Sequence, residues 1–217
     1  RYFRLLVNNG YLNDAEKYMR KTLRYYPGNI IYRLDAGILQ ERKGDEDAAA
    51  ELYAEVLNEV QNDPYKIRLV ASHFIKSDML EKAISSYQRG REANQDENLF
   101  ALELANVYRR LNEKDKMVLE YLKYADEDEA RISYVKNVLQ NILTEEEELQ
   151  SLSDLLLDKI QENPDKQLYN ELLIWINLQQ KNFYGAFMQA RAIDRRNRSD
   201  GDRVMGVASI ALDNQDY

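Results

Sequence analysis

Cysteine is absent from the 217 residues, and glycine and proline are scarce, with 8 and 3 copies. Without cysteine the chain has no disulfide, no thiolate ligand for a metal and no cysteine nucleophile. Few helix breakers, together with 44% hydrophobic and 31% charged residues, are typical of a helix-rich globular protein rather than a disordered one. The absence of cysteine fits an oxidising compartment and the cytosol equally well.

Two further features are missing, a basic stripe and a long apolar run. The formal net charge is −8, whereas proteins that bind nucleic acids usually carry a basic surface that displaces counterions from phosphates. No apolar stretch is long enough to cross a bilayer. We therefore expect no nucleic-acid partner and no direct membrane insertion.

The sequence does contain an internal repeat of about 34 residues. The repeat is anchored on small or apolar residues, with one extra residue after the fourth anchor: Ala15, Ala49, Ala83, Met117, Leu152 and Ala186. Another apolar residue follows each anchor by four positions: Met19, Tyr53, Tyr87, Tyr121, Leu156 and Ala190. Residues that tolerate a left-handed backbone precede the first four anchors by five positions: Gly10, Gly44, Asp78 and Asn112.

This pattern predicts a pair of helices in each repeat. Apolar residues at 67, 70, 71 and 74 define one face of a first helix, and those at 80, 83, 84 and 87 define one face of a second. A left-handed turn residue separates the two helices. Because one pair cannot cover its own apolar stripe, neighbouring pairs must stack.

The order of small residue, aromatic residue, alanine, aromatic residue and proline at this spacing resembles the tetratricopeptide repeat (TPR) family. The resemblance covers essentially the whole chain and is strongest in the repeats anchored at Ala15, Ala49, Ala83 and Met117. It implies an all-α fold, a right-handed superhelical solenoid of antiparallel helix pairs, as one domain over 1–217. The expected repeats are 1–29, 30–63, 64–97, 98–131, 132–165 and 166–199, with a partial repeat at 200–217.

The repeat is out of phase at both ends, so we expect a fragment of a longer bacterial TPR protein. Tyr2, Phe3, Val204 and Val207 would then be apolar residues exposed at the ends, available for self-association. The stretch from Leu172 to Arg196 is similar to bacterial envelope TPR proteins, which favours a periplasmic or cell-envelope location over the cytoplasm.

In the TPR family the first helix of each pair lines a concave groove that binds ligands. Transferred by register, this resemblance assigns the groove positions to Arg68, Ser72, Asn106, Arg109, Asn137, Asn141 and Trp175. Asparagine can pair with both donors and acceptors of a peptide backbone, and arginine can hold a carboxylate. The alternative is that these are ordinary solvated helix residues. The lysine and asparagine pattern by which some TPR proteins clamp a C-terminal carboxylate is not reproduced.

Other candidate chemistry has plainer structural explanations. His73 is the only histidine, so we expect a structural or exposed residue rather than a metal ligand or catalytic base. Thr144 and Glu147 are expected to form a capping box at a helix start. Phosphate-binding loops, HExxH and nucleophile-elbow motifs are absent, and we expect no catalytic residue, no metal and no cofactor.

The sequence therefore predicts a non-catalytic scaffold that binds a peptide or partner helix in the groove of the first helices. Two alternatives stay open. The chain could be a spacer or assembly strut of a larger cell-envelope protein, or a glycan-binding helical-repeat module, because a fold does not fix a function.

Overall fold

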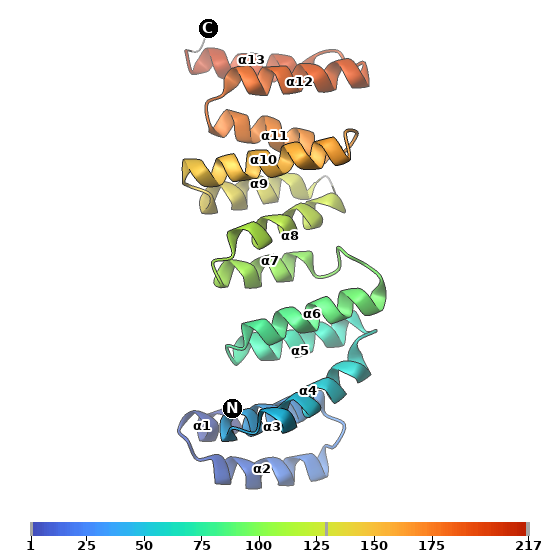
Figure 1. Cartoon of the computed structure of the whole chain (residues 1–217), viewed down its shortest axis with the longest axis vertical. Helices are drawn as coiled ribbons and strands as arrows, with labels where there is room; N and C mark the ends of the chain where they lie inside the picture. The colour runs from blue at the N-terminus through green and yellow to red at the C-terminus, as the bar shows by residue number, and fades with distance from the viewer. Residues whose placement is uncertain (1, 129, 216–217) are drawn as a thin grey trace. The chain divides into compact units, whose positions relative to one another are not determined.

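A computed structural model describes residues 2–128 and 130–215 of the chain. Within these ranges the chain forms thirteen α-helices and no β-strand (Figure 1). The predicted all-α class is therefore confirmed. The helices are α1 (Tyr2–Asn8), α2 (Leu12–Tyr25), α3 (Ile30–Lys43), α4 (Glu46–Val60), α5 (Pro64–Lys76), α6 (Leu80–Asn94), α7 (Ala101–Arg110), α8 (Lys114–Asp126), α9 (Arg131–Ile142), α10 (Glu146–Glu162), α11 (Gln167–Gln179), α12 (Phe183–Asn197) and α13 (Asp202–Asp213).

The chain divides into two compact units, Arg1–Met117 and Val118–Tyr217, and the division falls inside α8. In the first unit, α1 packs on α2, α3 on α4 and α5 on α6. In the second unit, α10 packs on α11, α11 on α12 and α12 on α13, while α9 also contacts α11. Consecutive helices thus pack against each other, and the repeat predicts the pairs α1/α2, α3/α4, α5/α6 and α11/α12.

The repeat anchors are the core of both units. All six are buried, as are the apolar residues four positions later: Ala15, Ala49, Ala83, Met117, Leu152 and Ala186, followed by Met19, Tyr53, Tyr87, Tyr121, Leu156 and Ala190. Tyr53 stands edge-on to Phe74 with ring centroids 5.1 Å apart, so that a second helix is fastened to the next first helix. Within the N-terminal unit this contact joins one pair to the next, as stacking requires.

The turns also follow the predicted chemistry. Gly10, Gly44, Asp78 and Asn112 all have positive φ between their helices. Lys181, five residues before Ala186, adopts the same conformation with φ of 56°, although lysine carries no sequence signal for it. The backbone requirement of the turn is therefore stronger than the preference of the residue that occupies it.

Two sequence predictions are wrong in detail. The capping box of α10 pairs Glu145 with Glu148, one residue later than predicted, and Glu148 accepts the backbone N–H groups of Thr144 and Glu145. Phe3 and Val207, which we expected to be exposed, are buried in the cores of their units. Phe3 and Val207 both face the neighbouring helix pair. Of the other two end residues, Tyr2 is strongly exposed and Val204 is partly buried.

Candidate functional site

The helices that open each pair, here called first helices, bring their polar residues together in the N-terminal unit. In this unit α3 contacts both α1 and α5. Between these three helices lies a hollow of about 270 Å³, named here the first-helix hollow. It is lined by Phe3, Arg4, Val7, Asn8, Asp35, Ile38, Arg42, Lys76, Ser77 and Asp78.

A buried polar cluster lies at this hollow. The Nε2 atom of His73 is 2.8 Å from Oδ1 of Asp35, and both side chains are almost fully buried. The guanidinium of Arg4 lies 3.4 Å from Nδ1 of His73. Arginine can only donate, so Nδ1 is the acceptor and Nε2 carries the proton that is donated to Asp35. Both ring nitrogens are thereby engaged, which fits the expected structural role of His73.

Cations are in excess at the rim of the hollow. Asp78 is paired with Arg110, at 3.1 Å. The described part of the chain offers no ion-pair partner to Arg42 or Lys76, which end α3 and α5 and are exposed. Cations in the last turn of a helix stabilise its dipole, which explains part of this arrangement. These cations, unpaired among the described residues, give the hollow a positive rim beside apolar walls formed by Phe3, Val7 and Ile38.

The groove residues predicted from register lie elsewhere on the first helices of this unit. Arg68 on α5 pairs with Glu103 on α7, with Nε 2.5 Å from Oε1, and its guanidinium lies 5.0 Å from the ring centroid of Phe100. Asn106 on α7 donates to the Leu102 carbonyl of its own helix at 2.8 Å. Ser72 is partly buried and Arg109 is exposed. None of these four lines the first-helix hollow.

The other three predicted residues lie in the C-terminal unit. Asn137 and Asn141 are exposed on α9, and the Asn141 amide donates to the Asn137 carbonyl at 2.6 Å. Trp175 is partly buried on α11. These residues all lie on first helices of one unit, but among the described residues the tryptophan makes no hydrogen bond or ring contact with either asparagine.

The hollow residues could have been found from the repeat. Arg42, Lys76 and Arg110 are each 34 residues apart, so the same helix position carries a cation three times in succession. Arg4 occupies the register of Ser72 and Asn106, one repeat before Ile38. A charge that recurs at one register position is therefore a sequence signal for this hollow.

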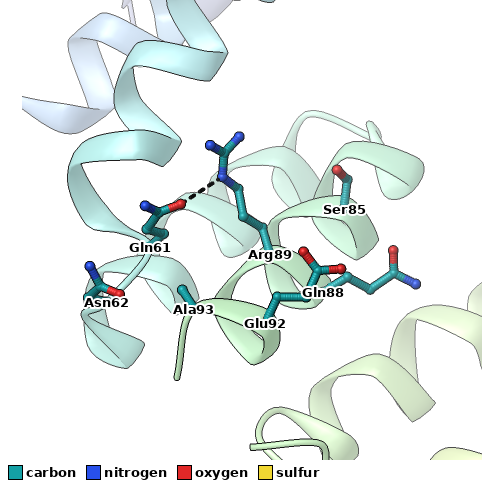
Figure 2. Close-up of a pocket in the computed structure, with 7 residues that line it drawn as sticks. All are labelled: Gln61, Asn62, Ser85, Gln88, Arg89, Glu92 and Ala93. Carbon is teal, nitrogen blue, oxygen red and sulfur yellow. Dashed lines mark hydrogen bonds between the residues drawn. The ribbon is translucent and has the colours of Figure 1, made fainter. Parts of the chain in front are cut away.

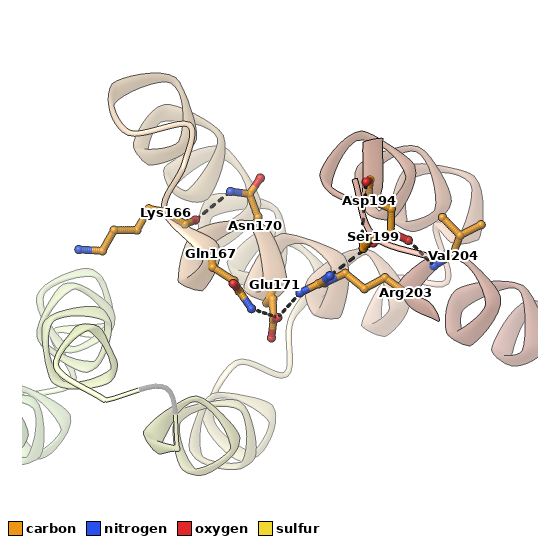
Figure 3. A network of polar contacts seen from close by, with 8 residues as sticks. All are labelled: Lys166, Gln167, Asn170, Glu171, Asp194, Ser199, Arg203 and Val204. Atoms are coloured by element: carbon orange, nitrogen blue, oxygen red, sulfur yellow. Dashed lines mark hydrogen bonds and ion pairs between the residues drawn. The ribbon is translucent and has the colours of Figure 1, made fainter. Parts of the chain in front are cut away.

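A polar network joins three helices in the C-terminal unit (Figure 3). Arg203 on α13 reaches both Glu171 on α11 and Asp194 on α12, with 3.4 Å between nitrogen and oxygen in each pair. Asp194 also accepts the Ser199 hydroxyl at 2.8 Å and the Val204 N–H at 3.3 Å. Burial acts to raise the pKa of Asp194, but these hydrogen bonds and the Arg203 charge outweigh it and lower the pKa below its usual range.

Lys136 on α9 faces the same region and is partly buried. Its removal from water lowers the pKa of the ammonium group, and the Glu171 carboxylate only partly opposes this effect. Glu171 itself is already engaged by Arg203 and by the Gln167 amide, which donates to it at 2.9 Å. The network holds the turn between α12 and α13 against α11, which is a structural role.

A shallower hollow of about 560 Å³ lies on the second helices of the N-terminal unit (Figure 2). It is lined by Gln61, Asn62, Ser85, Gln88, Arg89, Glu92 and Ala93. Arg89 on α6 donates from Nε to the Gln61 side chain at the end of α4, at 3.0 Å, and also contacts Asn58. This arginine ties two successive second helices together, so its hydrogen-bonding capacity is used within the fold.

No group of three or more histidine, aspartate and glutamate side chains is arranged to hold a metal ion in the described part of the chain. None of the helices within the described ranges combines the length and apolar character needed to span a membrane.

Comparison with known proteins supports no named activity. No protein-family model matches the chain, and no curated protein matches it. Among solved structures, it is similar to a tetratricopeptide repeat protein from Parabacteroides merdae, with 16% identity, a TM-score of 0.38, and coverage of 99% of this chain and 85% of that one. It is also similar to a chain of the Naa15/Naa10 complex bound to HypK, with 15% identity, a TM-score of 0.35, and coverage of 97% of this chain and 38% of that one.

The chain is built from TPR-like helical repeats. Its helix pairs, buried anchors and left-handed turns are those of such repeats.

Proposed function

We propose that this TPR-like chain is a non-catalytic scaffold that binds an extended peptide or partner helix along its first helices. The observation that carries the proposal is the first-helix hollow, where Arg42 and Lys76 stand without partners among the described residues. A concave site with apolar walls and a few placed polar groups is the usual form of a binding site. The excess of cations selects a partner segment that carries a carboxylate.

The buried cluster beneath the rim supports this assignment. Asp35, His73 and Arg4 satisfy one another, so the position of the Arg4 guanidinium is fixed before a ligand arrives. A preorganised donor loses less conformational entropy on binding than a free arginine does. An acidic side chain would be held by Arg4, Arg42 and Lys76, and an adjacent apolar side chain would pack on Ile38.

The groove residues assigned from register are proposed contacts within each unit. In the N-terminal unit, Arg68, Ser72, Asn106 and Arg109 would contact a partner on α5 and α7. In the C-terminal unit, Asn137, Asn141 and Trp175 would contact a partner on α9 and α11. Binding would require Arg68 to exchange its bond with Glu103 for one with the partner. The absence of a catalytic role is part of the same proposal, and it is supported by His73, whose two ring nitrogens are engaged by Arg4 and Asp35 and which therefore offers no free base.

Fluorescence anisotropy with labelled ten-residue peptides tests the proposal. Peptides of alternating glutamate and leucine should bind, and the matched glutamine and leucine peptides should bind at least tenfold more weakly. Capping the C-terminus as an amide separates recognition of side-chain carboxylates from recognition of the terminal one. Binding should weaken as salt rises, because exposed charges are screened.

A charge-matched pair of double variants locates the site. Arg42→Ala with Lys76→Ala should weaken binding about tenfold, since two exposed charge-assisted contacts are lost. Lys21→Ala with Arg24→Ala removes the same charge from exposed positions on α2 and should leave binding unchanged. Equal losses in both double variants would show that only net charge matters and would overturn the assignment.

A second candidate function is that of an assembly strut that contacts another copy of the chain. An exposed apolar face on α13 favours it, since Met205 is 70% and Leu212 63% exposed. Exposed apolar residues at helical spacing are typical of a surface that another element covers. The two functions are compatible, because the first-helix hollow and α13 lie in different units.

A further inference from the structure

A third hollow, of about 400 Å³, lies in the C-terminal unit between α10, α11 and α12. We name it the carboxamide hollow, because five of its lining residues are asparagine or glutamine. None of the described residues that line it is ionisable, although 31% of the chain is charged. The lining residues are Gln150, Ser153, Leu157, Leu173, Asn177, Gln180, Asn182, Gly185, Met188 and Gln189.

The asparagines of this hollow are fixed by one another. Asn177 is only 8% exposed and donates to the Leu173 carbonyl of its own helix at 2.8 Å. Its Oδ1 atom accepts the amide of Asn182 at 2.7 Å. Asn182 in turn accepts the N–H of Gly185 at 3.0 Å, which caps the start of α12. The side chains of Asn177 and Asn182 therefore form a fixed polar wall, and their hydrogen bonds are made within the protein rather than to a ligand.

The glutamines keep open hydrogen-bonding capacity. Gln189 donates its amide to Asn170 at 2.7 Å, and Gln180 makes a long contact of 3.5 Å to Gln150. In the described structure no donor reaches the side-chain carbonyl oxygen of Gln180 or Gln189. The hydrogen bond from the Gln189 amide to Asn170 positions the Gln189 carbonyl oxygen. The carbonyl oxygens of Gln180 and Gln189 can both accept a hydrogen bond from a ligand.

Apolar side chains complete the hollow. Leu157 on α10 and Met188 on α12 are each 43% exposed, although both are large and apolar. Methionine adapts its shape to different partners and is frequent at surfaces that bind varied apolar groups. No aromatic ring is among the described residues that line the hollow, which therefore offer no flat face on which a sugar ring would stack.

We propose that the carboxamide hollow binds an uncharged, extended segment of a partner polypeptide. Backbone N–H groups of the segment donate to the carbonyl oxygens of Gln180 and Gln189, and one apolar side chain packs between Leu157 and Met188. A charged side chain would bind more weakly, because it would lose contact with water and none of the described lining residues carries an opposite charge. The carboxamide hollow and the first-helix hollow lie in different units. The present proposal therefore does not depend on whether acidic peptides bind to the first-helix hollow.

Methyl NMR of methionine-labelled protein tests the proposal directly. The probe is a set of acetylated and amidated eight-residue peptides of alternating leucine and serine, compared with peptides in which serine is replaced by glutamate or by lysine. The neutral peptides should shift the Met188 methyl signal in a saturable way and leave Met205, on α13, unmoved. The two charged sets should bind at least tenfold more weakly.

Matched variants show whether the hollow itself is responsible. Gln180→Glu should weaken binding of the neutral peptides at least fivefold, whereas Gln179→Glu, exposed at the end of the same helix and outside the hollow, should change it less than twofold. Leu157→Asn should weaken binding, and Leu119→Asn, on the exposed surface of α8, should not. Circular dichroism of each variant confirms that the helices remain folded.

Three results would overturn the proposal. The first is equal binding by charged and neutral peptides, and the second is an equal effect of Gln180→Glu and Gln179→Glu. The third is a shift of the Met188 methyl by a neutral oligosaccharide, with maltohexaose as the probe, in the absence of any shift by the peptides. That third result would assign the hollow to glycans instead.

Discussion

The ring of Tyr53 occupies the space that a side chain at Gly37 would need. A Cβ atom on Gly37 would lie 2.8 Å from Cδ1 and 3.0 Å from Cζ of that ring. The ring is held in place by its edge-on contact with Phe74 and by a 3.0 Å hydrogen bond from its hydroxyl to Glu41. The close approach of α3 and α4 therefore depends on glycine at this position.

We expect Gly37→Ala to lower the free energy of unfolding by about 1–2 kcal/mol. Overpacking against a fixed ring costs about 1–3 kcal/mol, and only part of this is offset by the better helix propensity of alanine, about 0.5–1 kcal/mol. Urea denaturation followed by circular dichroism measures the change. Gly206→Ala is the control, because Gly206 lies in α13 with open space around it, and it should stabilise the protein.

The second prediction concerns the energetic coupling between Asp35 and His73. Removing either partner leaves a buried polar group without its hydrogen bond, at a cost of about 1–3 kcal/mol. Asp35→Ala and His73→Ala should therefore each destabilise the N-terminal unit, and the double variant should cost clearly less than the sum of the two. A double-mutant cycle in urea that gives additive effects would contradict the hydrogen bond as described.

The third prediction concerns acid stability. The folded state holds the pKa of Asp194 below its ordinary value of 3.8, so the unfolded state binds this proton first. The contribution is fully present above pH 3.8 and disappears as the pH falls through the lower folded-state pKa. Asp194→Asn should be less stable than the parent at pH 6, and the difference should shrink toward pH 2. Thermal denaturation across this range provides the measurement, and a pH-independent difference would refute the assignment.

The exposed face of α13 makes the fourth prediction. If another copy covers it, light scattering should show the mass rising with concentration, and Met205→Gln with Leu212→Gln should abolish the rise. Tyr65→Gln and Tyr184→Gln remove comparably exposed apolar surface elsewhere, and these changes should have no effect. A monomer at all concentrations would remove the support for the strut and leave the peptide-binding proposal untouched.

The repeat made most of the fold predictable. Spacing alone predicts that Ala15, Ala83 and Tyr121 lie in the core, because a helix face repeats every 3.6 residues and buried residues must follow it. Spacing does not predict the burial of Phe3 and Val207, because burial at the ends depends on which helix face meets the neighbouring pair. Lys181 shows the same limit for turns, because its left-handed backbone is imposed by the helices on either side.

The candidate sites were less predictable, for a physical reason. Transfer by register locates a position on a first helix, but it does not say whether the side chain is already engaged, as Arg68 is with Glu103. The residues that line the carboxamide hollow come from α10, α11 and α12 at irregular spacing, so no sequence pattern predicts this hollow. Hollows arise from the packing of different pairs, and the sequence of one pair does not contain that information.

The row of cations at Arg42, Lys76 and Arg110 has a consequence for how such a chain can change length. A duplication or deletion of one complete 34-residue segment within the N-terminal unit would leave the row in step and add or remove a single member. Insertion of one residue inside a first helix would instead turn everything after it by about 100° and point the next cation elsewhere. Natural variation in this unit should therefore proceed by whole helix pairs, with the spacing between charges preserved while their number changes.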